Sequence, residues 1–576
     1  MTKENDLNIS GLGEDFWVLH LEHQEEMNQP FTMIVDVVCR DPSVHPRTML
    51  GKAVTVEVTC GPQDQHTRQL SGMVTDWKFQ KRFHGNAAHT DEDHFQYRAV
   101  VRPSHALLSE KRGYKVWQNM TVKDMVSSIL QSHGVSARWE LTNELPDRTY
   151  IVQYDEPDLN FVHRQLEAEG AYYFYDHERG ELVFQNSHQK HPACVPIAQA
   201  PFRDEDDHDS AYTADETVFH AYLESRIIPA KYVAHGYNYE TPDLPMIAER
   251  SSRQYGAQVA GEVYESGHLF SSPADIDKYT FLMRERAECF SEVLKGSATC
   301  RSFAVGHVFD LQDHYSEELN QKWLIYKVKI QAKEVNYRVD FEAIPVSRPY
   351  RPAPITPKPK IHGYQTAVIA GKPGIPVFLD DMGRCKIRFH WDREGPRGEL
   401  SSKWVRRASG YAGQGFGFQH PPHVGQEVLV AFNNGNPDDP IVVGAVYNAV
   451  QKNPLGPAQK HQTILNTISG HTLRMDDTAG EQKVSFESSR DLDTIVEHNA
   501  AEAVKNIKST TVKGNYTIIS EEGQFSVTAD KQGVSLKCDT SKVVLTNESV
   551  TLSHGDNSIT INENGVQVKG TLIELN

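Results

Sequence analysis

The sequence predicts a mainly β protein of several domains that ends in a needle of very short strands. Apolar and polar residues alternate through much of residues 30–110 and again through 305–343, which is the pattern of half-buried strands. A proline-rich stretch at 349–359 marks a linker, and residues 362–448 beyond it read as one small β-barrel of about five strands. From Gly523 onward the chain repeats a unit of one apolar residue, any residue, and a second apolar residue.

The N-terminal part combines strands with three helices. Thr121 is a suitable N-cap for the first helix, which is predicted over 121–135. The second helix runs from about 159 to 169, ends at Gly170 and leads into a hairpin, and the third is expected over 278–294. Strands are predicted at 31–38, 54–58, 97–101, 171–175, 182–184, 305–309, 323–330 and 337–343.

The tail repeat has units that begin 9, 9, 7, 9 and 7 residues apart, with Gly, Asn, Asp and Lys in the gaps as in turns. A three-residue strand buries too little apolar area to offset the roughly 1–2 kcal/mol per residue that backbone ordering costs, so the units must stack on copies of themselves. A single-chain solenoid is one solution, but the short period favours a coil shared among three chains. The predicted core of this trimeric needle is Phe525, Val527, Val534, Leu536, Val543, Leu545, Val550, Leu552, Ile559, Ile561, Val566 and Val568.

Composition limits the function. The net charge of −18 argues against nonspecific nucleic-acid binding, which needs a basic footprint, and against docking on anionic lipid. The chain has no apolar run long enough for a membrane span, and its N-terminus has no apolar segment of a secretory signal, so we expect no signal peptide and a cytoplasmic protein. The seven cysteines are scattered and form no C-x-x-C pair, which is typical of reduced thiols in that compartment.

Five sequence blocks in the barrel region, in order and correctly spaced, resemble those of the VgrG spike proteins of type VI secretion systems. They are Gly383–Asp392 (GRCKIRFHWD), Ser401–Arg406 (SSKWVR), Gly413–Gly417 (GQGFG), Pro422–Val430 (PHVGQEVLV), and Gly435–Ile441 (GNPDDPI) with Gly444–Asn448 (GAVYN). Further stretches sit where the family has them, so that the resemblance covers nearly the whole chain: Leu50–Lys52, Arg68–Gly72, Asp158–Val162, Glu169–Tyr173 and Gly470–Gly480.

The resemblance implies a tandem β-barrel base with a small α/β insertion, an OB-fold barrel, and a C-terminal intertwined triple-stranded β-helix in a homotrimer. Three chains would then present a pseudo-sixfold ring of barrels. The implied domains are the first base β-barrel (1–110), the α/β insertion (111–210), the second base β-barrel (211–350), the proline-rich linker (351–361), the OB-fold domain (362–450), the neck (451–510) and the needle (511–576).

The same resemblance implies a mechanical function: a membrane-puncturing spike on a secretion tube, which delivers effectors when a sheath contracts. Its partners would be two further copies of itself, the hexameric tube protein at the N-terminal base, a PAAR-repeat cap protein at the tip, and effector or adaptor proteins. The cap would dock at Leu572, Ile573 and Leu575. The protein would stay in the cytoplasm until firing and would then be secreted into a target cell.

We predict no catalytic, cofactor-binding or metal site and no enzymatic activity. The glycines at Gly413–Gly417 lack the following helix and the Lys-Ser/Thr pair of a phosphate loop. His84, His89, Asp91, Asp93 and His94 lie close together, but their spacing matches no known set of metal ligands, so a solvated loop is expected. Two alternatives stay open: the baseplate spike of a phage or phage-like particle, and a spike with an unrecognised hydrolase activity.

Overall fold

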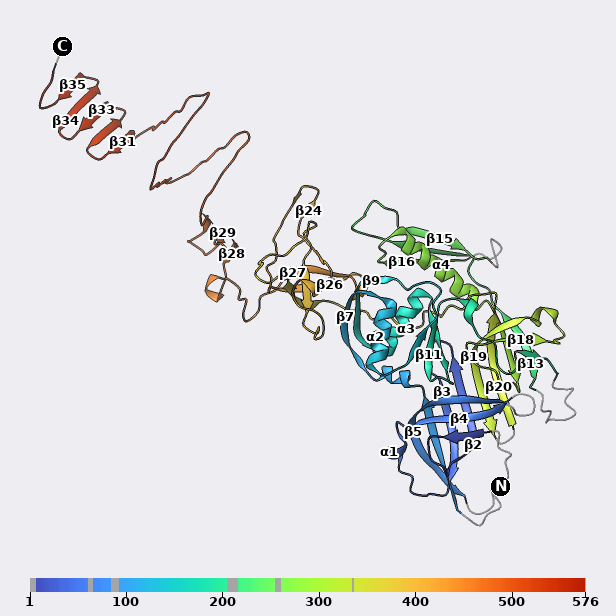
Figure 1. Cartoon of the computed structure of the whole chain (residues 1–576). Helices are drawn as coiled ribbons and strands as arrows, with labels where there is room; N and C mark the ends of the chain where they lie inside the picture. Colours follow the sequence, from blue (N-terminus) through green and yellow to red (C-terminus); the bar gives the residue numbers. More distant parts are fainter. Residues whose placement is uncertain are drawn as a thin grey trace. The chain divides into compact units, whose positions relative to one another are not determined.

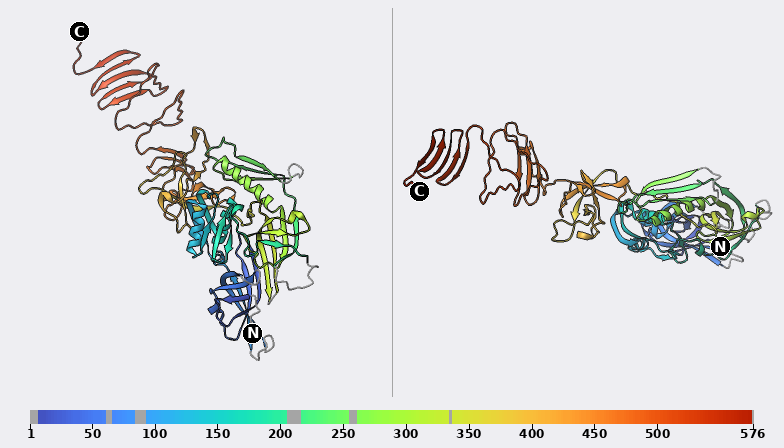
Figure 2. Two further views of the ribbon diagram at one scale, coloured as in Figure 1. Left: turned by 45° about the vertical axis from the view of Figure 1, so that its right-hand side comes forward. Right: turned by 90° about the horizontal axis from the view of Figure 1, so that it is seen from above.

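The computed structural model describes residues 7–60, 66–83, 93–204, 216–253, 261–333 and 336–574. It consists of two compact units, residues 1–456 and 457–576. Both units are mainly β, which confirms that part of the predicted fold class, while the trimer and its intertwined β-helix stay predictions (Figures 1 and 2). Within the described ranges, no helix combines the length and the apolar character needed to cross a membrane.

A twelve-stranded sheet forms the base of the first unit; one half takes its strands from residues 7–102 and the other from residues 199–345. The halves are hydrogen-bonded to each other where β2 pairs antiparallel with β19. One hydrophobic core, which includes Leu21, Val35, Ile330 and Phe341, runs through both halves. In sheet order the main path is β1 (Leu7–Ser10), β4 (Ala53–Cys60), β5 (His66–Phe83), β6 (His94–Arg102), β3 (Thr32–Cys39), β2 (Trp17–Glu26), β19 (Lys322–Lys333), β20 (Asn336–Pro345), β17 (Glu292–Ala298) and β13 (Val218–Ser225). Two further strands, β12 (Gln199–Pro201) and β18 (Val308–Gln312), attach at β19, and the short helix α1 spans Pro46–Met49.

The two helices predicted between residues 111 and 210 form with the capping residues that the sequence indicates. Helix α2 (Val122–Ser132) starts where the Thr121 hydroxyl accepts the Asp124 N–H at 3.0 Å. Helix α3 (Asp158–Glu169) ends at Gly170, whose φ of 67° requires the conformational freedom of glycine. Both helices pack on a separate core that contains Trp117, Phe161 and Phe184. The strands are β7 (Arg112–Thr121), β8 (Ala137–Trp139), β9 (Asp147–Pro157), β10 (Tyr172–Asp176) and β11 (Glu181–Gln185).

A third helix, α4 (Pro273–Cys289), covers one face of the small sheet β14 (Lys231–Gly236), β15 (Ile247–Ser251) and β16 (Glu262–His268). It begins earlier than predicted, because Ser272 caps it by accepting the Asp275 N–H at 3.3 Å and Pro273 suits its first turn. Beyond the linker, the predicted five-stranded barrel region contains a five-stranded sheet: β22 (Lys386–Phe389), β21 (Gln365–Ala370), β26 (Glu427–Phe432), β27 (Pro440–Ala445) and β23 (Arg406–Arg407). The glycine-rich block forms the small hairpin β24 (Ala412–Gly413) and β25 (Phe416–Gly417).

The second unit contains two single-layer antiparallel sheets (Figure 2). The neck sheet consists of β28 (Gln462–Asn466), β29 (Thr472–Asp476) and β30 (Lys483–Glu487). The strand ladder consists of β31 (Val534–Cys538), β32 (Ser541–Leu545), β33 (Ser549–His554), β34 (Asn557–Asn562) and β35 (Gly565–Lys569), each paired with the next. Residues 488–533 between the two sheets form no strand or helix.

Candidate functional site

The strand ladder places its apolar residues on one face in two straight columns. Its register pairs an apolar residue of each strand with an apolar residue of the next, and side chains opposite each other lie on the same face of a sheet. The first column is Val534, Leu545, Val550, Ile561 and Val566, and the second is Leu536, Val543, Leu552, Ile559 and Val568.

This apolar face has no cover within the described part of the chain. Leu536 is 62% exposed, Leu552 46% and Val566 66%. The opposite face is mostly polar, with rows such as Thr551 beside Thr560 and Lys537 beside Lys542. A single sheet layer with one apolar face does not form a core of its own, so the ladder is built to be covered by another surface.

Ten of the twelve predicted needle residues therefore lie together on one face. The other two, Phe525 and Val527, precede the ladder in a stretch without strands and are about 60% exposed. Residues 525–527 form no strand in the isolated chain, which has no neighbouring strand there to supply hydrogen bonds, and their place in a trimeric needle stays a prediction. At the predicted tip, Leu572 and Ile573 follow β35 with exposed side chains, whereas Leu575 lies outside the described residues.

The neck sheet has a second uncovered apolar face, which the sequence reasoning missed. Leu473 in the middle strand pairs with Leu465 on one side and with Phe486 on the other. Met475, also in the middle strand, pairs with Val484. Phe486 and Val484 are exposed by about two thirds. The apolar-any-apolar units Leu473–Met475 and Val484–Phe486 are the signal that could have revealed this face.

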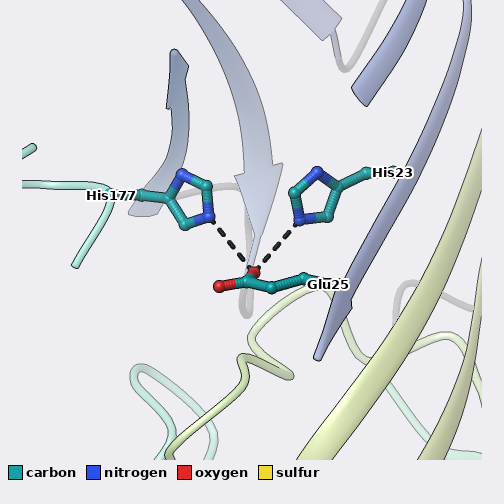
Figure 3. A group of neighbouring side chains, drawn as sticks. All are labelled: His23, Glu25 and His177. Carbon is teal, nitrogen blue, oxygen red and sulfur yellow. Dashed lines mark hydrogen bonds and ion pairs between the residues drawn. The ribbon is translucent and has the colours of Figure 1, made fainter. Parts of the chain in front are cut away.

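The base holds a buried polar cluster of Glu25, His23 and His177 (Figure 3). One carboxylate oxygen of Glu25, at the end of β2, lies 3.1 Å from Nε2 of His23 and 3.2 Å from Nε2 of His177. His177 belongs to the turn after β10, so the cluster joins the base sheet to the insertion. The backbone N–H of Ser71 in β5 donates to Nδ1 of His177 at 3.1 Å, which fixes the ring further.

The hydrogen bonds of this cluster favour structural anchoring over metal binding. Because Nδ1 of His177 accepts the Ser71 N–H, the ring proton is on Nε2, which then donates to Glu25 and has no lone pair for a metal. Burial lowers the pKa of His23 to about 4 despite the adjacent carboxylate. Burial alone would raise the pKa of Glu25, but its interactions with His177 and His23 outweigh burial and lower that pKa. Of the other residues weighed as metal ligands, His84, His89 and Asp91 lie outside the described residues.

The block Gly435–Ile441 docks the five-stranded region onto the insertion. The Asp438 carboxylate accepts the backbone N–H of Val152 in β9 at 2.7 Å and is partly buried in this contact. Burial raises the pKa of Asp438, because its effect is larger than the lowering effect of the nearby cations Arg164, Lys358 and Lys403. Asp438 therefore anchors the five-stranded region to the insertion.

Replacing Asp438 with alanine should loosen this contact. The Val152 N–H would lose its acceptor, which costs about 1–3 kcal/mol for a buried donor. We expect faster hydrogen exchange at the Val152 amide and a fall of several degrees in the melting temperature of the first unit. Asp438→Asn keeps an acceptor oxygen and should retain most of the protection. Equal exchange in the wild type and the alanine variant would contradict an anchoring role.

Comparisons with known proteins agree with this architecture. Residues 24–336, more than half of the chain, match the family model of the phage tail baseplate hub (GPD). Residues 378–447 match the model of the type VI secretion system/phage-baseplate injector OB domain, which confirms the predicted OB fold.

Among curated relatives, the chain is similar to the type VI secretion system spike protein VgrG4b of Pseudomonas aeruginosa, with 30% identity over 88% of this chain and 65% of the relative. It is 26% identical to VgrG1a of the same organism, over 86% of this chain and 78% of the relative. A Vibrio cholerae protein named actin cross-linking toxin VgrG1 is matched over only 42% of its length. The chain thus spans less than two thirds of the length of some of these relatives.

Two solved structures share the fold. One is an E. coli protein described as a component of the type VI secretion system with structural similarity to T4 bacteriophage tail proteins gp27 and gp5; the match has 22% identity and a TM-score of 0.54, over 76% of this chain and 99% of that one. The other is the lidded Francisella PdpA–VgrG complex, with 10% identity and a TM-score of 0.53, over 98% of this chain and 79% of that one.

Proposed function

This chain belongs to the phage tail baseplate hub (GPD) family, and on that premise we propose that three copies of it form the puncturing spike of a type VI secretion system. The observation that carries the proposal is the uncovered apolar face of the strand ladder, which ten side chains form in register. The curated spike proteins with similar sequences support the same function.

Three copies can cover the apolar face and the open edges of the strand ladder better than two copies can. Covering ten half-exposed aliphatic side chains stabilises the assembly by on the order of 10 kcal/mol per chain. Two ladders stacked face to face leave four open sheet edges, whereas three ladders arranged as a triangular prism can meet edge to edge. The neck sheet, with its own uncovered face at Leu473 and Phe486, would be closed by the same threefold arrangement.

The function that follows is mechanical. The base would sit on the hexameric tube, the prism would transmit force along its axis when the sheath contracts, and effectors or adaptors would travel as attached proteins. The tandem halves of the base sheet would give three chains six similar repeats, which suits a hexameric partner. A phage-like baseplate spike is the main alternative, and neighbouring genes for a sheath and a disassembly ATPase, as opposed to a capsid, would decide between them. Peptidoglycan and lipid hydrolysis assays on the purified trimer test the remaining alternative, a spike that is also a hydrolase.

The trimer is tested by measuring the mass of the purified full-length protein in solution. We expect three times the chain mass of 65.0 kDa at micromolar concentration. A monomer at that concentration would refute the proposal, and a dimer would refute the threefold prism.

Docking of a PAAR-repeat cap is tested at the tip. Aspartate at both Leu572 and Ile573 should abolish cap binding, because these exposed apolar side chains would form the contact. The control is Thr571→Asp, a neighbouring charge that should leave most of the binding intact. Cap binding that survives the double substitution would show that the cap docks elsewhere.

A further inference from the structure

A cavity of about 760 Å³ lies in the first unit between helix α4, the sheet β14–β16, helix α3 and the proline-rich linker. Its size is within the range of small-molecule sites. Apolar side chains form most of its wall, and the linker alone contributes six consecutive residues, 353–358. The apolar residues of the other walls are Ile228, Tyr232, Val263, Met283, Ala287 and Phe290.

The linker wall is held in place by hydrogen bonds and is not a loose tether. Thr356 donates both its backbone N–H, at 3.2 Å, and its hydroxyl, at 2.6 Å, to the Glu167 carboxylate on α3. Arg351 donates to the carbonyls of Gly170 and Asn186 at 3.0 and 2.9 Å. The cavity therefore has a defined shape on the linker side as well as on the helix side.

Two of the cationic side chains that line the cavity form no ion pair with a carboxylate of the described residues. Four cationic side chains line it against two carboxylates, in a protein with a net charge of −18. Arg164 is committed to Glu156, with contacts of 2.7 and 3.0 Å. Arg286 and Lys358 form no ion pair with any described residue.

Arg286 and Lys358 are the two groups that an anionic ligand would satisfy. Arg286 donates to the carbonyl oxygens of Glu167 and Ala168, and its buried Nε has no hydrogen-bond partner among the described atoms. Lys358 lines the cavity from the linker and is exposed to solvent. Desolvation lowers the pKa of Arg286, so its surroundings do not fully compensate its charge, whereas Lys358 keeps its contact with solvent and has the Asp438 carboxylate nearby.

The two carboxylates that line the cavity, Glu167 and Glu265, form no ion pair with Arg286 or Lys358. Both oxygens of Glu167 accept from Thr356, and Glu265 accepts the Tyr279 hydroxyl at 2.5 Å. Glu265, Arg286 and Lys358 nonetheless line the same cavity. The cavity thus has an apolar body and a cationic region, which is the complement of an amphipathic acid.

We propose that this cavity binds an apolar chain bearing one carboxylate, with the carboxylate at Arg286 and Lys358 and the apolar part against α4 and the linker. The occupant is either a free carboxylic acid or an acidic-apolar segment of a partner protein, which share this chemistry. Because the ligand would contact both the linker and α4, its binding would stiffen the connection between the base and the OB domain.

The direct test is calorimetric titration of the full-length protein with decanoate, and with decanol as the uncharged probe. We expect decanoate to bind with a Kd on the order of 0.1 mM and decanol at least about tenfold more weakly. Equal affinity for the two probes, or no decanoate binding at a concentration of several millimolar, would overturn the proposal.

Three variants separate the cavity from nonspecific binding to the uncovered apolar faces of the second unit. Lys358→Gln should weaken decanoate binding about tenfold or more, whereas Lys360→Gln, the same charge change on the same linker outside the cavity, should leave the Kd within about twofold. Ala287→Phe should block binding by filling the cavity without changing its charge. Unchanged binding in either Lys358→Gln or Ala287→Phe would overturn the proposal.

The source of the carboxylate is resolved by two further arms. Mass spectrometry of an organic extract of the purified protein would reveal a copurified free acid. A peptide pair, acetyl-Phe-Asp-Leu-amide and acetyl-Phe-Asn-Leu-amide, tests the partner segment. The site is assigned to a protein if the aspartate peptide binds more tightly than decanoate and if this binding is lost in the Lys358→Gln variant. If the extract contains no acid and neither peptide binds, the proposal fails.

Discussion

The Leu552→Asp variant should be a monomer at micromolar concentration, whereas the wild-type protein is expected to be a trimer. Leu552 lies in the middle strand of the ladder, between Val543 and Ile559 in the apolar column. In the assembled needle its side chain would be buried in all three copies, and an unpaired carboxylate in such a core costs several kcal/mol per copy. Mass measurement in solution reads the result directly.

The adjacent residue supplies the control. Thr551 belongs to the same strand but points to the opposite face, where its hydroxyl lies 3.3 Å from that of Thr560. Thr551→Asp therefore introduces the same charge at a solvent-facing position and should remain trimeric. If both variants stay trimeric, the apolar face is not the trimer interface; if both dissociate, the ladder is destabilised by charge on either face and the assignment of an inner face is wrong.

Local signals made much of the fold predictable from the sequence. The helix at 121–135 was predicted from an N-cap and helical spacing, and the observed α2 has that cap at Thr121. The ladder residues from Val534 to Val568 were predicted because strands of period two with turn residues between them need no long-range information. The unit at Phe525–Val527 has the same pattern but forms no strand in the isolated chain, since a strand also needs a partner.

The contacts that join distant parts of the chain could not be predicted. Glu25 meets a histidine two residues away and another, His177, in a different domain, and no spacing rule connects them. The linker cavity likewise combines residues of α3, α4, β16 and the linker, and only the packed structure brings Arg286 and Lys358 to one cavity. The Asp438 motif was visible in the sequence, but its partner Val152 was not.

Acidification should unfold the first unit between about pH 6.5 and 4.5. Burial lowers the pKa of His23, His163 and His191 to about 4 and that of His105 to about 3, against about 6.5 in an unfolded chain. Because the unfolded state binds these protons first, the free energy of unfolding falls as the pH drops below 6.5 and keeps falling until the folded values are reached. Four such groups would together cost on the order of 10 kcal/mol at pH 4.5, comparable to the whole stability of a domain.

Glu25 adds to the loss only at lower pH. Its folded pKa is lowered, so its stabilisation is fully present above its ordinary value of 4.5 and is lost as the pH falls further. Within the window from 6.5 to 4.5 the histidines therefore act without it. All seven tryptophans belong to the first unit, so their fluorescence during thermal unfolding reports on that unit alone.

His105 allows the cause to be tested at one residue. Both of its ring nitrogens are buried without a hydrogen-bond partner in the described structure, and its ring contacts Tyr173 and Tyr175. His105→Phe keeps the ring contacts and removes a titrating group, so it should raise the melting temperature at pH 5.5 by more than at pH 7.5, with an added gain of about 1.4 kcal/mol. The exposed His420, changed to Phe, should show no such difference. If the two variants shift equally, or if the wild-type melting temperature is the same at pH 7.5 and 4.5, buried neutral histidines do not set the acid limit, and the salt bridges and buried carboxylates of the base must set it instead.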